Sequence, residues 1–475
     1  MILHGSYVEF KAPQFRKLSD DQLERIHHAS LEILDRTGVC LHDQEAVDLL
    51  ARAGVRVDED RRARIPPGLV EWALSTAPRR VVLCDRHGRR VMPLERRNVF
   101  YGPGSDCPNI LDHRTGQRRP GALRDIEEGI RLCDALPNID FLMSLCVASD
   151  LEPATADRHQ KRAMLTNSTK PILFVTTEFE GCVDAVAMAE IVVGGAEALR
   201  RNPLCACYIN VTHPLRHNAE ALRKLFFLAG KGLPTTYTPV VLRGASGPVT
   251  AAGALALANA GELAGLVLAQ LKREGAPVIL SGGTNDMLDM RTLGDIYAAP
   301  ENRVLCVEMA HYYGLPIFGL AGASDSKLPD EQAAAEAAFS LILESMAGAH
   351  LVHDVGYLES GMCNSFEQIV ICDELIHFVK RFMRGLEVSE ETLALDVIDQ
   401  VGPDGDFLST EHTRRHFRED WYARLLDRSG FDAWSAGGGK TLRQRARERV
   451  EEILADHRPE PLPADVQRKI DALIA

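Results

Sequence analysis

Residues 207–213 read Cys207-Tyr208-Ile209-Asn210-Val211-Thr212-His213, an uncharged apolar run that passes directly into polar residues. A strand that is buried on both faces of a parallel sheet has this composition, because neither face contacts water. Seven further runs of this kind recur along the chain, and a stretch with helical spacing follows each of them. The eight runs lie at 98–103, 140–148, 171–176, 204–211, 234–240, 277–281, 316–320 and 350–355.

The helical stretches alternate with these runs. They lie near 122–135, 155–168, 181–198, 217–231, 249–274, 299–313, 330–347 and 365–386. Eight strands that alternate with eight helices are the pattern of a (β/α)8 TIM barrel. The main alternative is a doubly wound open sheet. Eight units without a clear glycine-rich nucleotide turn favour closure, so we predict an α/β fold of the TIM-barrel class.

The barrel is predicted to span residues 97–390, between two extensions. Residues 1–96 have the pattern of a small α+β segment, with a capping box at Ser19 and Gln22 and a short hairpin around Gly88. Residues 391–475 are charged and amphipathic, which predicts a C-terminal helical extension. We expect this extension to pack around the barrel or to form a dimer interface, and a homo-oligomer is therefore expected.

Composition restricts the class of protein. The net charge of −13 argues against a nucleic-acid partner. The most apolar long segment, 249–271, is interrupted by polar residues, which predicts a buried helix and no membrane span. The 11 cysteines form no CxxC pair, and the first residues carry no signal-peptide pattern. We therefore expect a cytoplasmic protein.

Polar residues follow the predicted strands, and the active site of a TIM barrel lies at the C-terminal ends of its strands. No standard catalytic motif is present, so we name no catalytic residue. An aromatic residue at a strand end either faces a ligand or fills a core layer. His353 and Asp354 are either site residues or a structural hydrogen-bonded pair, and His213 is either a site residue or a loop residue. The predicted substrate-binding residues are Tyr101, Phe174, Glu178, Tyr208, Asn210, His213, Tyr237, Arg243, Asp325, His353, Asp354 and Tyr357.

Several stretches, in their order along the chain, resemble the trimethylamine–corrinoid methyltransferase family. Three of them lie at 247–253 (Gly-Pro-Val-Thr-Ala-Ala-Gly), 320–327 (Leu-Ala-Gly-Ala-Ser-Asp-Ser-Lys) and 353–361 (His-Asp-Val-Gly-Tyr-Leu-Glu-Ser-Gly). Residues 437–441 (Gly-Gly-Gly-Lys-Thr) with 450–454 (Val-Glu-Glu-Ile-Leu) are similar to the family's C-terminal signature. The resemblance covers essentially the whole chain and implies a barrel methyltransferase.

The archetype of that family uses pyrrolysine to process trimethylamine, whereas this sequence shows only standard residues. The chain therefore resembles the non-pyrrolysine branch, which includes the glycine betaine methyltransferases. The loop from Asp325 to Lys327 is where we expect the counterpart of the pyrrolysine position. The resemblance implies a corrinoid (cobalamin) acceptor. This chain lacks the DxHxxG motif of a cobalamin-carrying domain, because Arg90 stands where its glycine is required. We therefore expect the corrinoid to be carried by a separate partner protein.

A quaternary amine suits this branch chemically. It already carries a positive charge and leaves as a neutral amine, so Co(I) can attack its methyl group without a general acid, and no metal of the chain's own is expected. Aromatic and carboxylate side chains would hold the cation. A betaine carboxylate would contact Arg243 or backbone N–H groups at a helix N-terminus. The alternatives are another barrel enzyme (a lyase, an aldolase or a hydrolase with a metal at His213, Asp286 or His353) or a non-catalytic protein that binds methylated amines.

Overall fold

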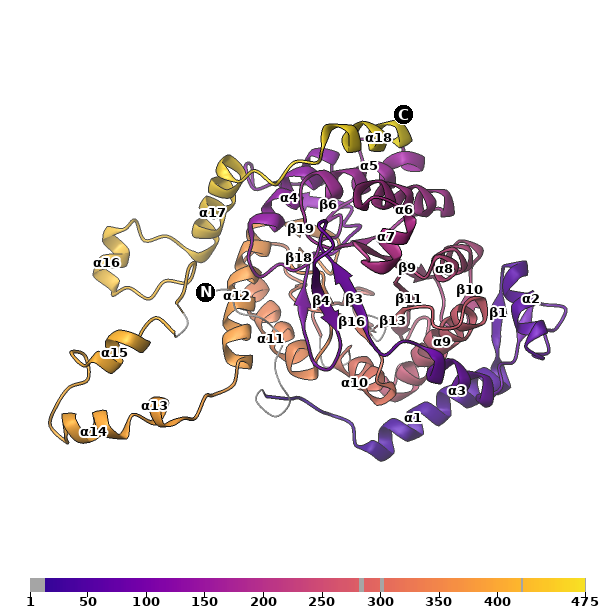
Figure 1. The fold of residues 1–475 in the computed structure, drawn as a ribbon, viewed down its shortest axis with the longest axis horizontal. Helices are drawn as coiled ribbons and strands as arrows, with labels where there is room; N and C mark the ends of the chain where they lie inside the picture. Colours follow the sequence, from indigo (N-terminus) through magenta and orange to yellow (C-terminus); the bar gives the residue numbers. More distant parts are fainter. Residues whose placement is uncertain (1–12, 282–285, 300–302, 420–421, 475) are drawn as a thin grey trace.

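The computed structural model describes residues 13–281, 286–299, 303–419 and 422–474. Seven parallel strands form one curved sheet at its centre (Figure 1). In sheet order they are β5 (Phe100–Tyr101), β17 (Leu351–His353), β16 (Ile317–Leu320), β13 (Val278–Ser281), β11 (Thr235–Pro239), β9 (Cys205–Val211) and β8 (Ile172–Phe174).

Residues 140–142 close this sheet between its two edge strands. Asp140 N donates to Tyr101 O of β5 at 2.6 Å. On the other side, Leu142 N donates to Pro171 O at 2.9 Å, and Leu173 N of β8 donates to Leu142 O at 2.8 Å. The segment thus takes the place of the second strand, and the predicted closed barrel is confirmed. Its continuation is less regular than the expected strand over 140–148, because Leu145 adopts a left-handed backbone conformation (φ 65°).

The predicted helices surround the barrel (Figure 1). Each follows one strand of the closed barrel, and the two neighbours α6 and α7 together occupy the stretch expected at 181–198. The helices are α4 (Leu123–Ala135), α5 (Pro153–Thr166), α6 (Phe179–Val193), α7 (Ala196–Arg201), α8 (Ala219–Lys231), α9 (Ala251–Lys272), α10 (Arg303–Tyr313), α11 (Glu331–Ala347) and α12 (Phe366–Met383). Among the described residues, α9 alone has the length and composition of a membrane span, and most of it is buried within the fold.

The N-terminal segment packs on the outside of α9. Ser19 and Gln22 form the predicted capping box at the start of the first helix. The segment comprises α1 (Asp20–Glu32), the π-helical turn η1 (Ile33–Thr37), β1 (Val39–Leu41), α2 (Gln44–Arg52), β2 (Arg62–Ala63) and α3 (Pro67–Thr76). β1 also pairs with β10 (Arg216–His217), which ties this segment to the loop that follows β9.

The predicted hairpin closes the N-terminal end of the barrel. β3 (Val81–Cys84) and β4 (Arg90–Leu94) are antiparallel, and Cys84 N donates to Pro203 O just before β9. Leu83 and Met92 belong to the same buried apolar cluster as the inward-facing Phe318 of β16. Apolar side chains therefore fill the interior from this end, and the opposite end carries the loops after the strands.

Two small sheets formed by these loops lie over the C-terminal ends of the strands. One consists of β12 (Leu242–Arg243), β14 (Asp286–Leu288) and β15 (Asp295–Ile296). The other consists of β18 (Tyr357–Leu358), β19 (Cys363–Ser365), β6 (Asn109–Leu111) and β7 (Arg118–Pro120).

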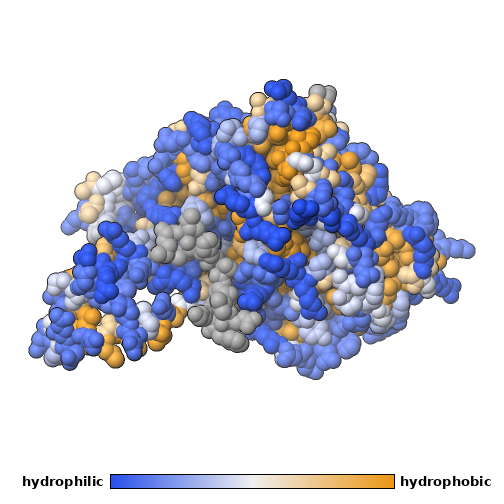
Figure 2. All heavy atoms as spheres, viewed as in Figure 1, coloured by the Kyte–Doolittle hydropathy of each residue, from blue (hydrophilic) through white to orange (hydrophobic). Residues whose placement is uncertain are grey.

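The C-terminal extension has a part that packs against the barrel and a part that projects from it. The helices α17 (Leu442–Asp456) and α18 (Ala464–Ile474) pack against the barrel helices. The four short helices between α12 and α17 have no buried residue, and they project from the body in Figure 1. They are α13 (Glu390–Leu393), α14 (Leu395–Val401), α15 (Glu411–His416) and α16 (Phe431–Ala436). In Figure 2, apolar atoms are exposed among the hydrophilic ones on this projecting part, and Leu408 is 86% exposed.

Gly265 of α9 allows this helix to approach the barrel wall. A Cβ atom at this position would overlap the ring of Tyr237 in β11, whose hydroxyl is hydrogen-bonded to His217 Nδ1 at 2.6 Å. We therefore expect Gly265→Ala to destabilise the fold by about 1–3 kcal/mol, measured by urea denaturation. Gly68→Ala in α3, where a Cβ atom meets open space, is the matched control and should be neutral or slightly stabilising. Equal urea concentrations at the unfolding midpoint for the two variants would contradict this account of the packing.

Candidate functional site

The loops after β5 and β17 meet closely at the C-terminal end of the barrel. A Cβ atom on Gly104 would overlap both the carboxylate of Asp354 and the ring of Tyr357, so only glycine fits there. Asp354 itself adopts the left-handed region (φ 68°), which is uncommon for a residue with a side chain. The hydroxyl of Tyr357 donates to Ser105 O. These contacts fix the Asp354 carboxylate at the opening of the barrel.

His353 points into the barrel just below this opening. Its ring stacks on Phe318 with 3.9 Å between centroids, and its Nδ1 donates to Gly319 O at 2.6 Å. Burial lowers the pKa of His353, so the ring is neutral, and its Nε2 lies 3.5 Å from Asp354 Oδ1. The ring centroids of Tyr208 and His353 are 6.0 Å apart. His353 therefore joins the apolar interior to the polar opening.

A connected set of polar side chains continues from Asp354. The hydroxyl of Tyr297 donates to Asp354 Oδ2, and the ring of Tyr297 lies 4.4 Å from the guanidinium carbon of Arg303. Arg303 Nε donates to Asp286 Oδ1 at 2.6 Å. Asp325 Oδ1 accepts from Tyr297 N at 3.1 Å and Ser360 Oγ at 3.0 Å. Arg303 is fully buried, and within the described ranges its Nη2 has no hydrogen-bond partner.

Carboxylates outnumber cations in this set. The side chain of Asp106 is exposed at the rim, but the protein atoms packed around it and the nearby Asp354 raise its pKa to about 6. Burial, together with Asp286, raises the pKa of Asp295 to about 7. Burial also raises the pKa of Asp286 and Asp325. We call the five aspartates (Asp106, Asp286, Asp295, Asp325, Asp354) together with Tyr208, Tyr297 and Tyr357 the acidic mouth.

A pocket of about 360 Å³ opens beside Asp106. It lies between the end of β8 and the start of α5, and its lining combines apolar side chains with polar groups, among them Asp157 and Thr176. Burial raises the pKa of Asp157 as well. The pocket therefore offers a small ligand apolar contacts and the carboxyl groups of Asp106 and Asp157.

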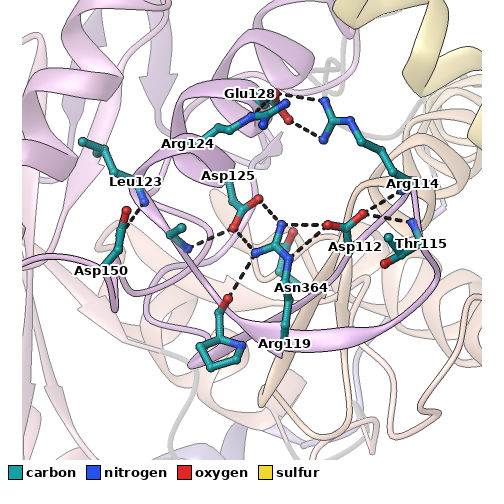
Figure 3. Close-up of polar contacts among 12 residues, drawn as sticks. Asp112, Arg114, Thr115, Arg119, Leu123, Arg124, Asp125, Glu128, Asp150 and Asn364 are labelled. Carbon is teal, nitrogen blue, oxygen red and sulfur yellow. Dashed lines mark hydrogen bonds and ion pairs between the residues drawn. The ribbon is translucent and has the colours of Figure 1, made fainter.

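An ionic network supports the mouth from one side. Figure 3 shows Arg119 of β7 between the carboxylates of Asp112 and Asp125, with distances of 2.6–3.0 Å. Asp125 belongs to the first turn of α4, so the network joins the β6–β7 hairpin to a barrel helix. Since β6 pairs with β19, and β19 with β18, this anchoring holds the strand that carries Tyr357.

The structure brings together only part of the predicted set. Tyr208, Asp325, Asp354 and Tyr357 belong to the acidic mouth, and His353 lies directly below it, 3.5 Å from Asp354. Asn210 is the penultimate residue of β9 and is exposed. The other three predicted loop residues make local contacts outside the mouth. Glu178 is the N-cap of α6, and His213 Nδ1 accepts a hydrogen bond from Leu215 N. Arg243 Nε donates to Val249 O.

Three predicted aromatic residues do not reach the mouth. Tyr101 bonds Ser345 of α11 at 2.6 Å, Phe174 lies 4.3 Å from Lys161 Nζ of α5, and Tyr237 stacks on His217. All three point into the layer between strands and helices, because side chains alternate between the two faces of a strand.

Five residues of the site were not among the predicted substrate-binding residues: Asp106, Asp286, Asp295, Tyr297 and Arg303. Asp106 ends the glycine-rich turn after β5, a signal that could have identified it, and Asp286 was predicted only as a metal ligand in the hydrolase alternative. Asp295 and Tyr297 lie in the long connection between β13 and α10, which has no periodic pattern, and Arg303 is the first residue of α10.

Comparison with known proteins identifies the family. The family model described as trimethylamine methyltransferase (MTTB) matches residues 3–475. A trimethylamine methyltransferase of Desulfitobacterium hafniense is 33% identical over 460 residues, which cover 96% of this chain and 92% of that protein. A glycine betaine methyltransferase from another strain of the species is 30% identical, covering 98% and 97% of the two chains. The solved monomethylamine methyltransferase of Methanosarcina barkeri shares the fold, with a TM-score of 0.51 at 11% identity, covering 93% of this chain and 88% of that one. The chain therefore belongs to the trimethylamine methyltransferase family.

Proposed function

We propose that this chain is a cytoplasmic enzyme that transfers a methyl group from a quaternary amine to the Co(I) of a corrinoid carried by a separate partner protein. The observation that carries the proposal is the acidic mouth, in which five aspartates and three tyrosines lie at one end of the barrel and the buried Arg303 pairs with one of the aspartates, Asp286. Such a mouth favours a cation. The names of the relatives favour methyl transfer over the lyase, aldolase and hydrolase alternatives.

The raised pKa values support a cationic substrate on energetic grounds. Desolvated carboxyl groups close to one another resist ionisation, because each charge is poorly solvated and repels its neighbours. A quaternary ammonium ion in their midst relieves this repulsion. It cannot donate a hydrogen bond, so aromatic faces and carboxylate oxygens are suitable contacts for it. Tyr208 and Tyr297 supply the aromatic faces. Asp354 supplies the carboxylate, which the hydroxyl of Tyr297 holds in position.

The buried Arg303 supports a substrate that also carries a carboxylate. Its Nε donates to Asp286, and its guanidinium group lies over the ring of Tyr297. Its Nη2 has no hydrogen-bond partner among the described residues. A betaine carboxylate would satisfy this donor, and a buried donor without a partner is costly. Arg303 is therefore our candidate for the role that the sequence assigned to Arg243 or to backbone N–H groups at a helix N-terminus.

The proposed reaction needs orientation more than acid–base chemistry. One N-methyl group has to point out of the barrel while the ammonium end is held by the mouth. The positive charge leaves the substrate nitrogen as the methyl group departs, so a very tight cation site would oppose the reaction. Carboxyl groups whose pKa values lie near 6 and 7 provide a moderate and adjustable negative charge.

The first prediction concerns the reaction itself. The purified chain, mixed with a Co(I) corrinoid protein and glycine betaine, should convert cob(I)alamin to methylcob(III)alamin, followed by the visible spectrum. Tetramethylammonium and choline, which lack a carboxylate, should react more weakly than betaines. No spectral change with any quaternary amine would overturn the proposed function, and binding without methyl transfer would favour the non-catalytic alternative.

The second prediction concerns Asp354. Asp354→Asn keeps the shape of the side chain but removes its charge, and the loss of one charged contact of about 1–3 kcal/mol should raise KM for the amine by roughly 10- to 100-fold. Asp432→Asn on α16 removes an exposed carboxylate far from the barrel and serves as the control. An unchanged KM in Asp354→Asn would remove the mouth from the cation site.

The third prediction concerns pH. A carboxyl group with a raised pKa is uncharged below that pKa, so the mouth gains negative charge as the pH rises through about 6 (Asp106) and about 7 (Asp295). A quaternary amine is charged at every pH, so KM for it should fall as the pH rises across this range. In Asp295→Asn the step near pH 7 should disappear, whereas a pH-independent KM in the unmodified chain would contradict the prediction.

A further inference from the structure

The projecting part of the C-terminal extension lacks an apolar core. α13, α14 and α15 contain four, seven and six residues, and none of these residues is buried. Helices of this length are not stable alone in water, and packing of an apolar face normally stabilises them. Some other interaction has to hold α13 against α15, which lies about 20 residues further along the chain.

Three side chains that favour metal ions converge between these two helices. His412 and His416 are one helical turn apart on α15, with 4.4 Å between ring centroids. Both rings turn their Nε2 atoms to Glu391 of α13: His416 Nε2 lies 3.1 Å from Glu391 Oε1, and His412 Nε2 lies 3.2 Å from Glu391 O. One potential ligand atom from each of the three residues lies within 4.8 Å of the others.

A fourth residue, Glu419, contacts the second ring nitrogen of His416, as carboxylates do for histidines that bind metals. Glu419 Oε2 lies 2.9 Å from His416 Nδ1, so this nitrogen donates to a carboxylate and Nε2 is directed at Glu391. A histidine that binds a metal usually donates its second N–H to a carboxylate in this way, which fixes the tautomer and the ring orientation. An ordinary surface ion pair does not require this second contact.

We propose that Glu391, His412 and His416 bind one divalent transition-metal ion, of which Zn²⁺ is the best fit. Two imidazoles and one carboxylate are a common zinc ligand set, and water takes the fourth position at an exposed site. On binding, the two Nε2 atoms give up any proton to solvent and bind the metal instead, with the ligands moving closer together. Arg415, which lies 3.0 Å from Glu391 Oε1, is displaced.

The role of this ion is structural. Binding joins α13 to α15 and closes the loop between them, so the free energy of metal binding becomes free energy of ordering for the projecting part. The site is formed by the extension, away from the acidic mouth, and the proposed methyl transfer does not involve it. The proposal therefore stands independently of the substrate and the acceptor.

The experiment uses the full chain, stripped with a chelator and titrated with ZnCl2 by calorimetry. One equivalent should bind, and the same chain loaded with Co²⁺ should show the visible absorption of a tetrahedral site with nitrogen and oxygen ligands. His412→Ala and His416→Ala should each abolish this site. Glu419→Gln should weaken binding by about 10- to 100-fold, because it removes only the orienting contact.

The matched control is His28→Ala, since His28 is an exposed helical histidine with a glutamate one turn away, Glu24. It should bind Zn²⁺ as the unmodified chain does. Limited proteolysis gives a second readout, because Zn²⁺ should protect residues 390–419 in the unmodified chain and in His28→Ala but not in His416→Ala. Binding that persists in both His412→Ala and His416→Ala, or no stoichiometric binding by the unmodified chain, overturns the proposal.

Discussion

Closure of the parallel sheet is the constraint on which the other features depend. An open edge between β5 and β8 would leave backbone N–H and C=O groups without partners, and residues 140–142 supply them on both sides. Closure also places the C-terminal ends of all strands at one opening. The loops that carry Asp106, Asp325 and Asp354 can therefore meet, although more than 200 residues separate the first from the last.

The fold of the acidic mouth holds several carboxyl groups close together, which is electrostatically unfavourable. Burial raises the pKa of Asp286, Asp295 and Asp325, and the close contacts of Gly104 and Tyr297 hold the Asp354 carboxylate near them. Arg303 beside Asp286 and Lys224 near Asp106 offset part of this charge. The excess of carboxyl groups over cations favours a positively charged ligand. The chemistry of the mouth thus agrees with family membership, although each rests on separate observations.

The barrel could be predicted from the sequence because strands buried on both faces have uncharged apolar runs, such as 204–211 and 350–355. The same property explains which parts of the site could not be predicted. When both faces of a strand are apolar, the alternation that separates inward from outward residues disappears. Tyr208 and Tyr237 are therefore alike in the sequence, but one faces the interior and the other faces α9. Tyr297 lies in a connection without periodicity and Arg303 directly follows it, so only the folded structure brings them to Asp354.

The β3–β4 hairpin has a kinetic consequence for the proposed reaction. Because it fills the N-terminal end of the barrel, substrate and acceptor protein must use the same opening. An acceptor that has docked covers the route by which the demethylated amine departs. The proposed reaction would then follow a compulsory order, in which the amine enters first, the acceptor docks second and the product amine leaves last. Excess acceptor would occupy the empty enzyme and inhibit turnover, and a higher concentration of amine would relieve this inhibition.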